Sequence, residues 1–231
     1  MITRGRIALF AGMLLLALVI FMPLSLALSI LGLEAKGISA RSASGTIWSG
    51  RLSEARLGRL ALGDVEVGLR PLSLLIGQAR IDMQSLFGRG SMTSTAKGYS
   101  IDDATARVST AGVFAPIPLD SVDLTAVSVS FESGKCQKAE GRLRASFSGE
   151  VGSLSLAQGL SGTIRCDNGA LLLPLVSQSA MERLNLHIQG DGDYRAELFV
   201  RSTDPLLAGK LGSAGFTPSA GGFVFRVAGK L

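Results

Sequence analysis

The chain carries few side chains that could do chemistry. Its 231 residues include one histidine, His187, and two cysteines, Cys136 and Cys166. A site that needs two imidazoles, or four Cys and His ligands, cannot be assembled from these within one chain. His187 belongs to the alternating segment L-N-L-H-I, which places it on the face opposite the leucines. We therefore expect a surface histidine on a strand rather than a general base.

Sequence motifs of catalysis are missing as well. The chain has neither the G-x-S-x-G elbow of hydrolases nor the G-x-x-x-x-G-K-[S/T] phosphate loop. The G-D-G-D stretch at Asp191 and Asp193 lacks the further acidic ligands of a calcium loop and favours a hairpin. Asp102 and Asp103 are interpreted as a solvated turn. We expect no enzymatic activity, no catalytic residue, no cofactor and no metal site.

The charge distribution argues against a nucleic-acid partner. The formal net charge is +5, and Arg4 and Arg6 near the N-terminus contribute two of the positive charges. The other charges are interspersed along the chain, without a basic block or interleaved aromatic residues. Nucleic-acid binding usually needs such a basic patch, so no nucleic-acid partner is expected.

An uncharged run of 27 residues, 7–33, follows the N-terminal tail. A helix of that length reaches roughly 40 Å, more than the hydrocarbon core of a bilayer. Pro23 lies inside the run and is expected to kink or end the helix. The alternative is a cleaved signal peptide with small residues at Ser25 and Ala27, but the run is longer than a usual signal core. The length favours a transmembrane anchor.

This anchor divides the chain into a cytoplasmic tail (1–6), the anchor (7–33) and an exported domain (34–231). Arg4 and Arg6 favour a cytoplasmic N-terminus, although Lys36 and Arg41 on the other side weaken the contrast. The expected arrangement is therefore a single membrane crossing with the C-terminal domain outside the cytoplasm.

Beyond residue 40 the pattern changes to short runs in which apolar residues alternate with polar or small ones. This period of two predicts about ten strands with one buried face. Segments 71–76 and 204–211 are predicted as short helices, each with a proline suited to the first turn. Residues 113–122 interrupt the pattern and suggest two halves, 40–115 and 119–231. The predicted fold class is mainly β, an antiparallel β-rich domain with two short helices after one N-terminal transmembrane helix.

Three side chains remain as candidate site residues. In an oxidising compartment, a Cys136–Cys166 bridge could stabilise the fold by about 3.5 kcal/mol in the chain-entropy model. Two unrelated buried thiols are the alternative. Trp48 is the only tryptophan, and its large apolar ring suits either a core anchor or a partner interface.

The order of several short motifs along the chain resembles the type II secretion system protein N family, also called general secretion pathway protein N. The resemblance covers nearly the whole chain and is carried by G-T-I-W-S-G at 45–50, L-R-P-L-S-L-L-I-G at 69–77, L-S-G-T-I-R-C at 160–166 and G-D-Y at 192–194. It implies a Gram-negative inner-membrane protein with a periplasmic β-rich domain and the two-cysteine region of that family, Cys136 and Cys166.

The resemblance also implies the function. The chain would be an accessory, non-catalytic part of the machine that exports folded proteins across the outer membrane. Its partners would be the inner-membrane platform and the outer-membrane secretin, together with the membrane, and energy would come from a separate ATPase. The alternative is a periplasmic lipid-handling protein, because a domain rich in Leu, Val and Ala could line an apolar groove.

Overall fold

The computed structural model describes residues 4–30, 38–58, 60–148, 150–151, 154–155, 159–202 and 204–230. Over these residues the fold is mainly antiparallel β, as predicted. The helices are α1 (Arg4–Ile20), α2 (Leu24–Ile30), α3 (Pro71–Leu74) and α4 (Pro205–Ser213). The two short helices predicted at 71–76 and 204–211 are confirmed as α3 and α4.

The strands outnumber the ten that alternation predicts. They are β1 (Ile38–Ser39), β2 (Ser42–Gly45), β3 (Gly50–Leu57), β4 (Leu60–Leu69), β5 (Ala79–Ser85), β6 (Gly88–Ser94), β7 (Gly98–Ser109), β8 (Leu119–Glu132), β9 (Lys135–Phe147), β10 (Glu150–Val151), β11 (Leu154–Ser155), β12 (Leu160–Thr163), β13 (Arg165–Asp167), β14 (Ala170–Val176), β15 (Glu182–Ile188), β16 (Asp193–Val200), β17 (Thr217–Ser219) and β18 (Gly222–Lys230).

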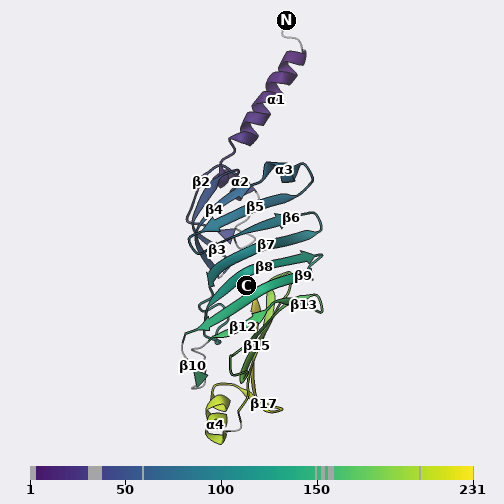
Figure 1. Cartoon of the computed structure of the whole chain (residues 1–231). Coiled ribbons are helices and arrows are strands. Elements are labelled where there is room, and N and C mark those ends of the chain that lie inside the picture. Colours follow the sequence, from purple (N-terminus) through teal and green to yellow (C-terminus); the bar gives the residue numbers. More distant parts are fainter. Residues whose placement is uncertain are drawn as a thin grey trace.

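Sixteen of the strands form one antiparallel sheet. Its order is β1-β3-β4-β5-β6-β7-β8-β9-β12-β14-β15-β16-β18-β17, with β2 paired to β3 and β13 paired to β14, while β10 and β11 form a separate pair. Figure 1 shows α1 projecting from the end of the sheet where α2 and α3 lie, with α4 and β17 at the opposite end. The sheet is continuous across residues 110–118, because β7 pairs with β8 on either side of that loop.

Buried apolar side chains form two separate clusters. The larger cluster lies between strands β8 to β18, the 113–117 loop and α4. The loop closes it, since Phe114 packs edge-on against Tyr194 with ring centroids 4.9 Å apart. The smaller cluster joins α2 to the first strands through Leu24, Leu52, Ala55 and Val65. Alternate residues of each strand share a face of the sheet. The apolar residues that recur at every second position in the sequence therefore lie together on this inner face.

The N-terminal segment folds as two helices rather than one. α1 ends at Ile20 and α2 begins at Leu24, so the predicted effect of Pro23, ending the first helix, is confirmed. Residues 31–33 of the expected anchor lie outside the described residues. Among the helices that the structure describes, none combines the length and the apolar character needed to cross a membrane.

The solvated turn predicted at Asp102 and Asp103 is wrong. Both residues lie inside β7, where the register against β8 shifts between Ile101 and Ala104. Asp103 has φ +49°, and its N–H donates to Oγ of Ser128 at 3.0 Å. The pair therefore forms a β-bulge, and aspartate tolerates the left-handed backbone needed there as readily as it tolerates a turn.

Candidate functional site

The G-T-I-W-S-G motif fastens α1 to the sheet. The indole Nε1 of Trp48 donates to the carbonyl oxygens of Val19, at 3.2 Å, and Ile20, at 3.0 Å. These carbonyls belong to the last turn of α1, where regular helical partners run out; the Val19 carbonyl also accepts from the N–H of Met22 at 3.4 Å. The half-buried Trp48 side chain therefore supplies a hydrogen-bond donor to the carbonyls at the end of the helix, although Trp48 follows Ile20 by 28 residues in the chain.

Backbone hydrogen bonds extend this junction into the sheet. The N–H of Ile47 donates to the carbonyl of Met22 at 3.1 Å, and the N–H of Leu69 donates to the carbonyl of Ile47 at 3.0 Å. Pro23 forms an isolated antiparallel bridge with Thr46. The segment after α1 is thus bound to the loop between β2 and β3, and that loop is bound to the end of β4. We call this set of contacts the helix–sheet junction.

Two glycines of the motif are required by the local geometry. Gly45 has φ +83°, a left-handed conformation that glycine adopts without steric cost. At Gly50 the constraint is space: a Cβ there would lie 2.6 Å from Cδ2 of Leu24 and 2.8 Å from the carbonyl oxygen of Thr46. The missing side chain therefore lets α2 approach the sheet and place Leu24 in the smaller cluster.

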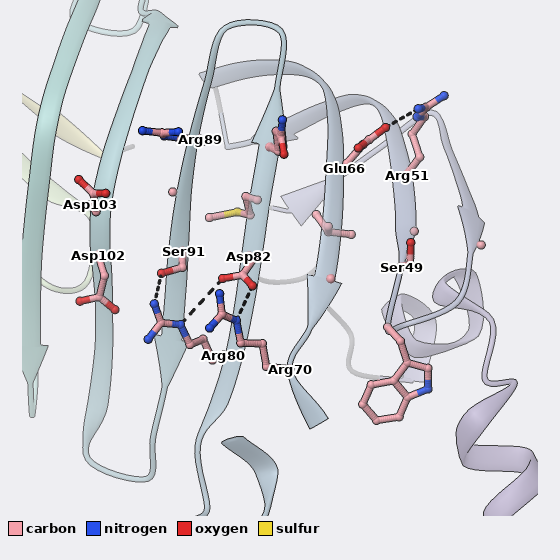
Figure 2. A pocket seen from close by; sticks show the side chains of 18 of the residues that line it. Ser49, Arg51, Glu66, Arg70, Arg80, Asp82, Arg89, Ser91, Asp102 and Asp103 are labelled. Carbon is pink, nitrogen blue, oxygen red and sulfur yellow. Dashed lines mark hydrogen bonds and ion pairs between the residues drawn. The ribbon is translucent and has the colours of Figure 1, made fainter. Parts of the chain in front are cut away.

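Next to the junction, β3 to β7 carry a polar hollow of about 700 Å³ (Figure 2). It lies on the face of the sheet opposite the smaller apolar cluster. The hollow contains both signs of charge. Arg70 Nε donates to Asp82 Oδ2 at 2.5 Å, and Arg80 Nη2 donates to Oγ of the buried Ser91 at 3.0 Å. Nε of Arg80 lies 3.9 Å from the same Asp82 carboxylate. Figure 2 shows both guanidinium groups directed at Asp82.

Other charged side chains of the hollow, those of Arg51, Glu66 and Asp102, are also engaged. Arg51 Nη2 donates to Oε1 of Glu66, and this hydrogen bond raises the pKa of Arg51 above its usual value. Oδ2 of Asp102 accepts hydrogen bonds from Thr93 Oγ1 at 3.3 Å and from Ser100 Oγ at 3.2 Å. Carboxylates held in this way are partners of guanidinium and hydroxyl groups rather than free bases. The hollow is a polar surface that could bind a polar ligand or another protein.

The two cysteines form a disulfide that links β9 to β13. Cys136 and Cys166 have an S–S distance of 2.00 Å and a Cα–Cα distance of 5.5 Å, so the predicted bridge is confirmed and the alternative of two unrelated thiols is wrong. The N–H of Cys136 also donates to the carbonyl of Gly169 at 2.7 Å. The bridge therefore fastens the β13–β14 turn to the start of β9.

His187 has a neighbour that the sequence does not reveal. Its Nε2 lies 3.4 Å from Oδ2 of Asp167, and both side chains are partly exposed. β13 and β15 both pair with β14, which brings these two side chains together. The pair lies outside the polar hollow, and its one imidazole and one carboxylate do not make up a catalytic set with a nucleophile.

The acidic residues after β15 form a hairpin turn, as predicted. The N–H of Asp193 donates to Oδ1 of Asp191 at 3.1 Å, and Lys230 Nζ lies 3.3 Å from Oδ1 of Asp193. Among the described residues, no group of three or more His, Cys, Asp and Glu side chains could hold a metal ion.

The fold and the junction define a class: a large antiparallel β-sheet protein whose N-terminal helix is fastened to the first strands. The family model described as "Type II secretion system (T2SS), protein N" matches residues 36–226. The chain belongs to this family, and its membership implies involvement in type II secretion. No significant match was found among curated proteins or solved structures.

Proposed function

We propose that the chain is an accessory, non-catalytic component of the type II secretion machinery, anchored once in the inner membrane through α1, because α2, the later helix of the 7–33 run, packs on the sheet. Side chains of α1 support the anchor: Phe10 is 77% exposed, and Leu14 and Leu18 are also exposed. Phe21, which follows the helix directly, is 74% exposed. Apolar side chains that contact water along a whole helix favour a lipid or protein environment for it. The observation that carries the proposal is the helix–sheet junction, which holds α1 by hydrogen bonds at the sheet.

The β-domain would then stand in the periplasm. The Cys136–Cys166 disulfide supports this compartment, because structural disulfides persist where the environment is oxidising. A junction held by side-chain and backbone hydrogen bonds would present the domain at a defined angle to the membrane. The proposed role is structural: the sheet offers faces and edges to the inner-membrane platform and the outer-membrane secretin.

The experiment that tests this role is crosslinking in cells that contain the tagged full-length chain, followed by purification in detergent and mass spectrometry. Recovery of the platform or the secretin is the expected result. Trp48→Ala would serve as a matched variant, because it removes the indole that holds α1 while leaving residues 7–33 unchanged. Crosslinks that contain neither platform nor secretin would overturn the proposal.

A second candidate function, lipid handling, is favoured by one observation. Leu69, Ile81, Met92 and Ile101 are paired side by side across β4 to β7, and each is half-buried. Paired residues share a face of the sheet, so the row continues the apolar face of Val129, the buried partner of Ile101. This apolar row could contact an acyl chain.

Lipid handling would be tested by measuring the phospholipid that copurifies with the full chain. Met92→Glu should lower the phospholipid recovered per protein, since it places a charge in the apolar row. The neighbouring Thr93→Glu is the matched control, because Thr93 is also half-buried but lies on the polar face. Equal phospholipid in wild type and both variants would exclude this function.

A further inference from the structure

An apolar projection formed by residues 71–76 has no role in the contacts described so far. We call it the leucine knob; it comprises α3 and the two residues that follow. Leu72, Leu75 and Ile76 are 77%, 83% and 72% exposed, and Leu74 is 43% exposed. The segment, P-L-S-L-L-I, contains no charged residue. A single exposed leucine is ordinary on a protein surface, but a contiguous apolar group marks an interaction site.

Hydrogen bonds place the leucine knob close to the end of α1. Ile47 is the connecting residue: its N–H donates to the carbonyl of Met22, just after α1, and its carbonyl accepts from the N–H of Leu69. The knob begins two residues after Leu69. Figure 1 accordingly shows α3 at the end of the sheet from which α1 projects.

The base of the leucine knob is held by the sheet. The N–H of Arg70 donates to the carbonyl of Arg80 at 2.9 Å, and the N–H of Gln78 donates to the carbonyl of Ser73 at 3.0 Å. The Arg70 side chain turns toward Asp82 on the polar face, so this cation does not compete with the apolar tip. The knob is therefore a closed turn with outward leucines on a fixed base.

We infer that the leucine knob inserts into the surface of the bilayer that holds α1, at the boundary between headgroups and acyl chains. The inference rests on the proposed anchoring through α1. An uncharged apolar turn beside the end of a membrane anchor suits that boundary, where apolar side chains gain by leaving water. With the knob as a second point of attachment, the sheet could not rotate freely about α1, so one face would keep a constant orientation to the membrane.

The test uses the full chain in vesicles of phosphatidylethanolamine and phosphatidylglycerol, with an environment-sensitive fluorophore on one engineered cysteine at a time. Leu75→Cys reports on the leucine knob. Leu86→Cys is the matched control, since Leu86 is a 94% exposed leucine in the turn at the other end of β5. Leu14→Cys reports on α1. Without reductant, Cys136 and Cys166 stay bonded to each other and unlabelled.

Lipids with a quencher near the headgroup should remove most of the fluorescence at position 75 and leave position 86 unchanged. Lipids with a quencher deep in the acyl chain should quench position 14. Quenching at position 14 without quenching at position 75 would overturn the inference and still support the anchor. Equal quenching at positions 75 and 86 would overturn the inference in the same way. Quenching at 75 but not at 14 would support the surface contact and overturn the proposed anchor, and no quenching at either would overturn both.

Discussion

The indole Nε1 of Trp48 lies 3.0 Å from the carbonyl oxygen of Ile20, although 28 positions separate the two residues in the chain. The sequence suggests two roles for Trp48, a core anchor or a partner interface. Its observed partner is the last turn of α1, within the same chain. This contact fixes the orientation of α1 relative to the β-domain.

Trp48→Phe keeps a ring in place but removes the donor. We expect the free energy of unfolding to fall by about 1 kcal/mol, the usual contribution of one hydrogen bond, and the position of α1 relative to the sheet to become less defined. Spin labels at Leu14 and Gln84 would measure this as a broader distance distribution. The control is Tyr99→Phe, which removes the hydrogen bond that the Tyr99 hydroxyl donates to the Gly190 carbonyl and should leave the distance distribution as in wild type. An unchanged distribution in Trp48→Phe would contradict the role of the indole.

Gly50→Ala should loosen the packing of α2 on the sheet. The new Cβ would meet Leu24 and the backbone oxygen of Thr46, and such overpacking typically costs about 1 to 3 kcal/mol. Thermal unfolding followed by circular dichroism would measure the loss. The control is Gly212→Ala in α4, where a Cβ meets no atom within 4 Å and alanine favours the helix. Equal unfolding temperatures for the two variants would show that the space at Gly50 is unimportant.

Replacing both cysteines with alanine should lower the free energy of unfolding by about 3 to 4 kcal/mol, because the unfolded chain would no longer be constrained by the bridge. Urea unfolding of the variant and of wild type, with and without reductant, would measure the difference. Reductant should affect wild type alone. On non-reducing gels Cys136 should be linked to Cys166, and alkylation of both thiols without prior reduction would rule out the bridge.

The Arg107–Asp123 ion pair predicts a pH dependence. Arg107 Nε donates to Asp123 Oδ1 at 2.6 Å, and this hydrogen bond lowers the pKa of Asp123 below its usual 3.8. A carboxylate with a lowered pKa in the folded state stabilises the protein above the unfolded pKa, and this stabilisation is lost as the pH falls through the folded pKa.

Wild type should therefore be slightly more stable than Asp123→Asn at neutral pH, and the difference in the free energy of unfolding should shrink as the pH drops below 3.8. Urea unfolding across this range is the measurement. In an Arg107→Gln background the same substitution should give a much weaker pH dependence. An equal pH dependence with and without Arg107 would show that the ion pair is not its cause.

His187→Ala should leave secretion intact. The imidazole has one acidic neighbour, Asp167, and is partly exposed, so its loss should disturb neither a catalytic set nor the core. Complementation of a strain that lacks the protein, scored by the amount of exported substrate, would measure this. A loss of secretion with normal folding and normal protein level would revive an enzymatic role for His187.

Local patterns predict much of this fold. Alternation in 122–131, 184–188 and 194–200 corresponds to β8, β15 and β16, since a half-buried strand needs an apolar residue at every second position. Pro71 and Pro205 begin α3 and α4, because proline suits the first turn of a helix. The shortest strands, such as β1 and β13, contain too few residues for a period to be seen.

The sites depend on contacts that no local pattern describes. Trp48 reaches α1 only because the β2–β3 loop lies against the end of that helix. Asp167 reaches His187 only because β13 and β15 share β14 as a neighbour. Periodicity reports which face a residue occupies, but it does not report which strand lies alongside.

From β3 to β9 each strand of the sheet pairs with the strand made just before it. Contacts between neighbours in the chain form quickly, because little entropy is lost in closing short loops. A chain that emerges from its N-terminus could therefore add each strand to an edge that already exists, with α1 and the helix–sheet junction as the starting point. Cys166 emerges 30 residues after Cys136, so the disulfide would close only after β9 had joined, fixing an arrangement that the order of synthesis had already built.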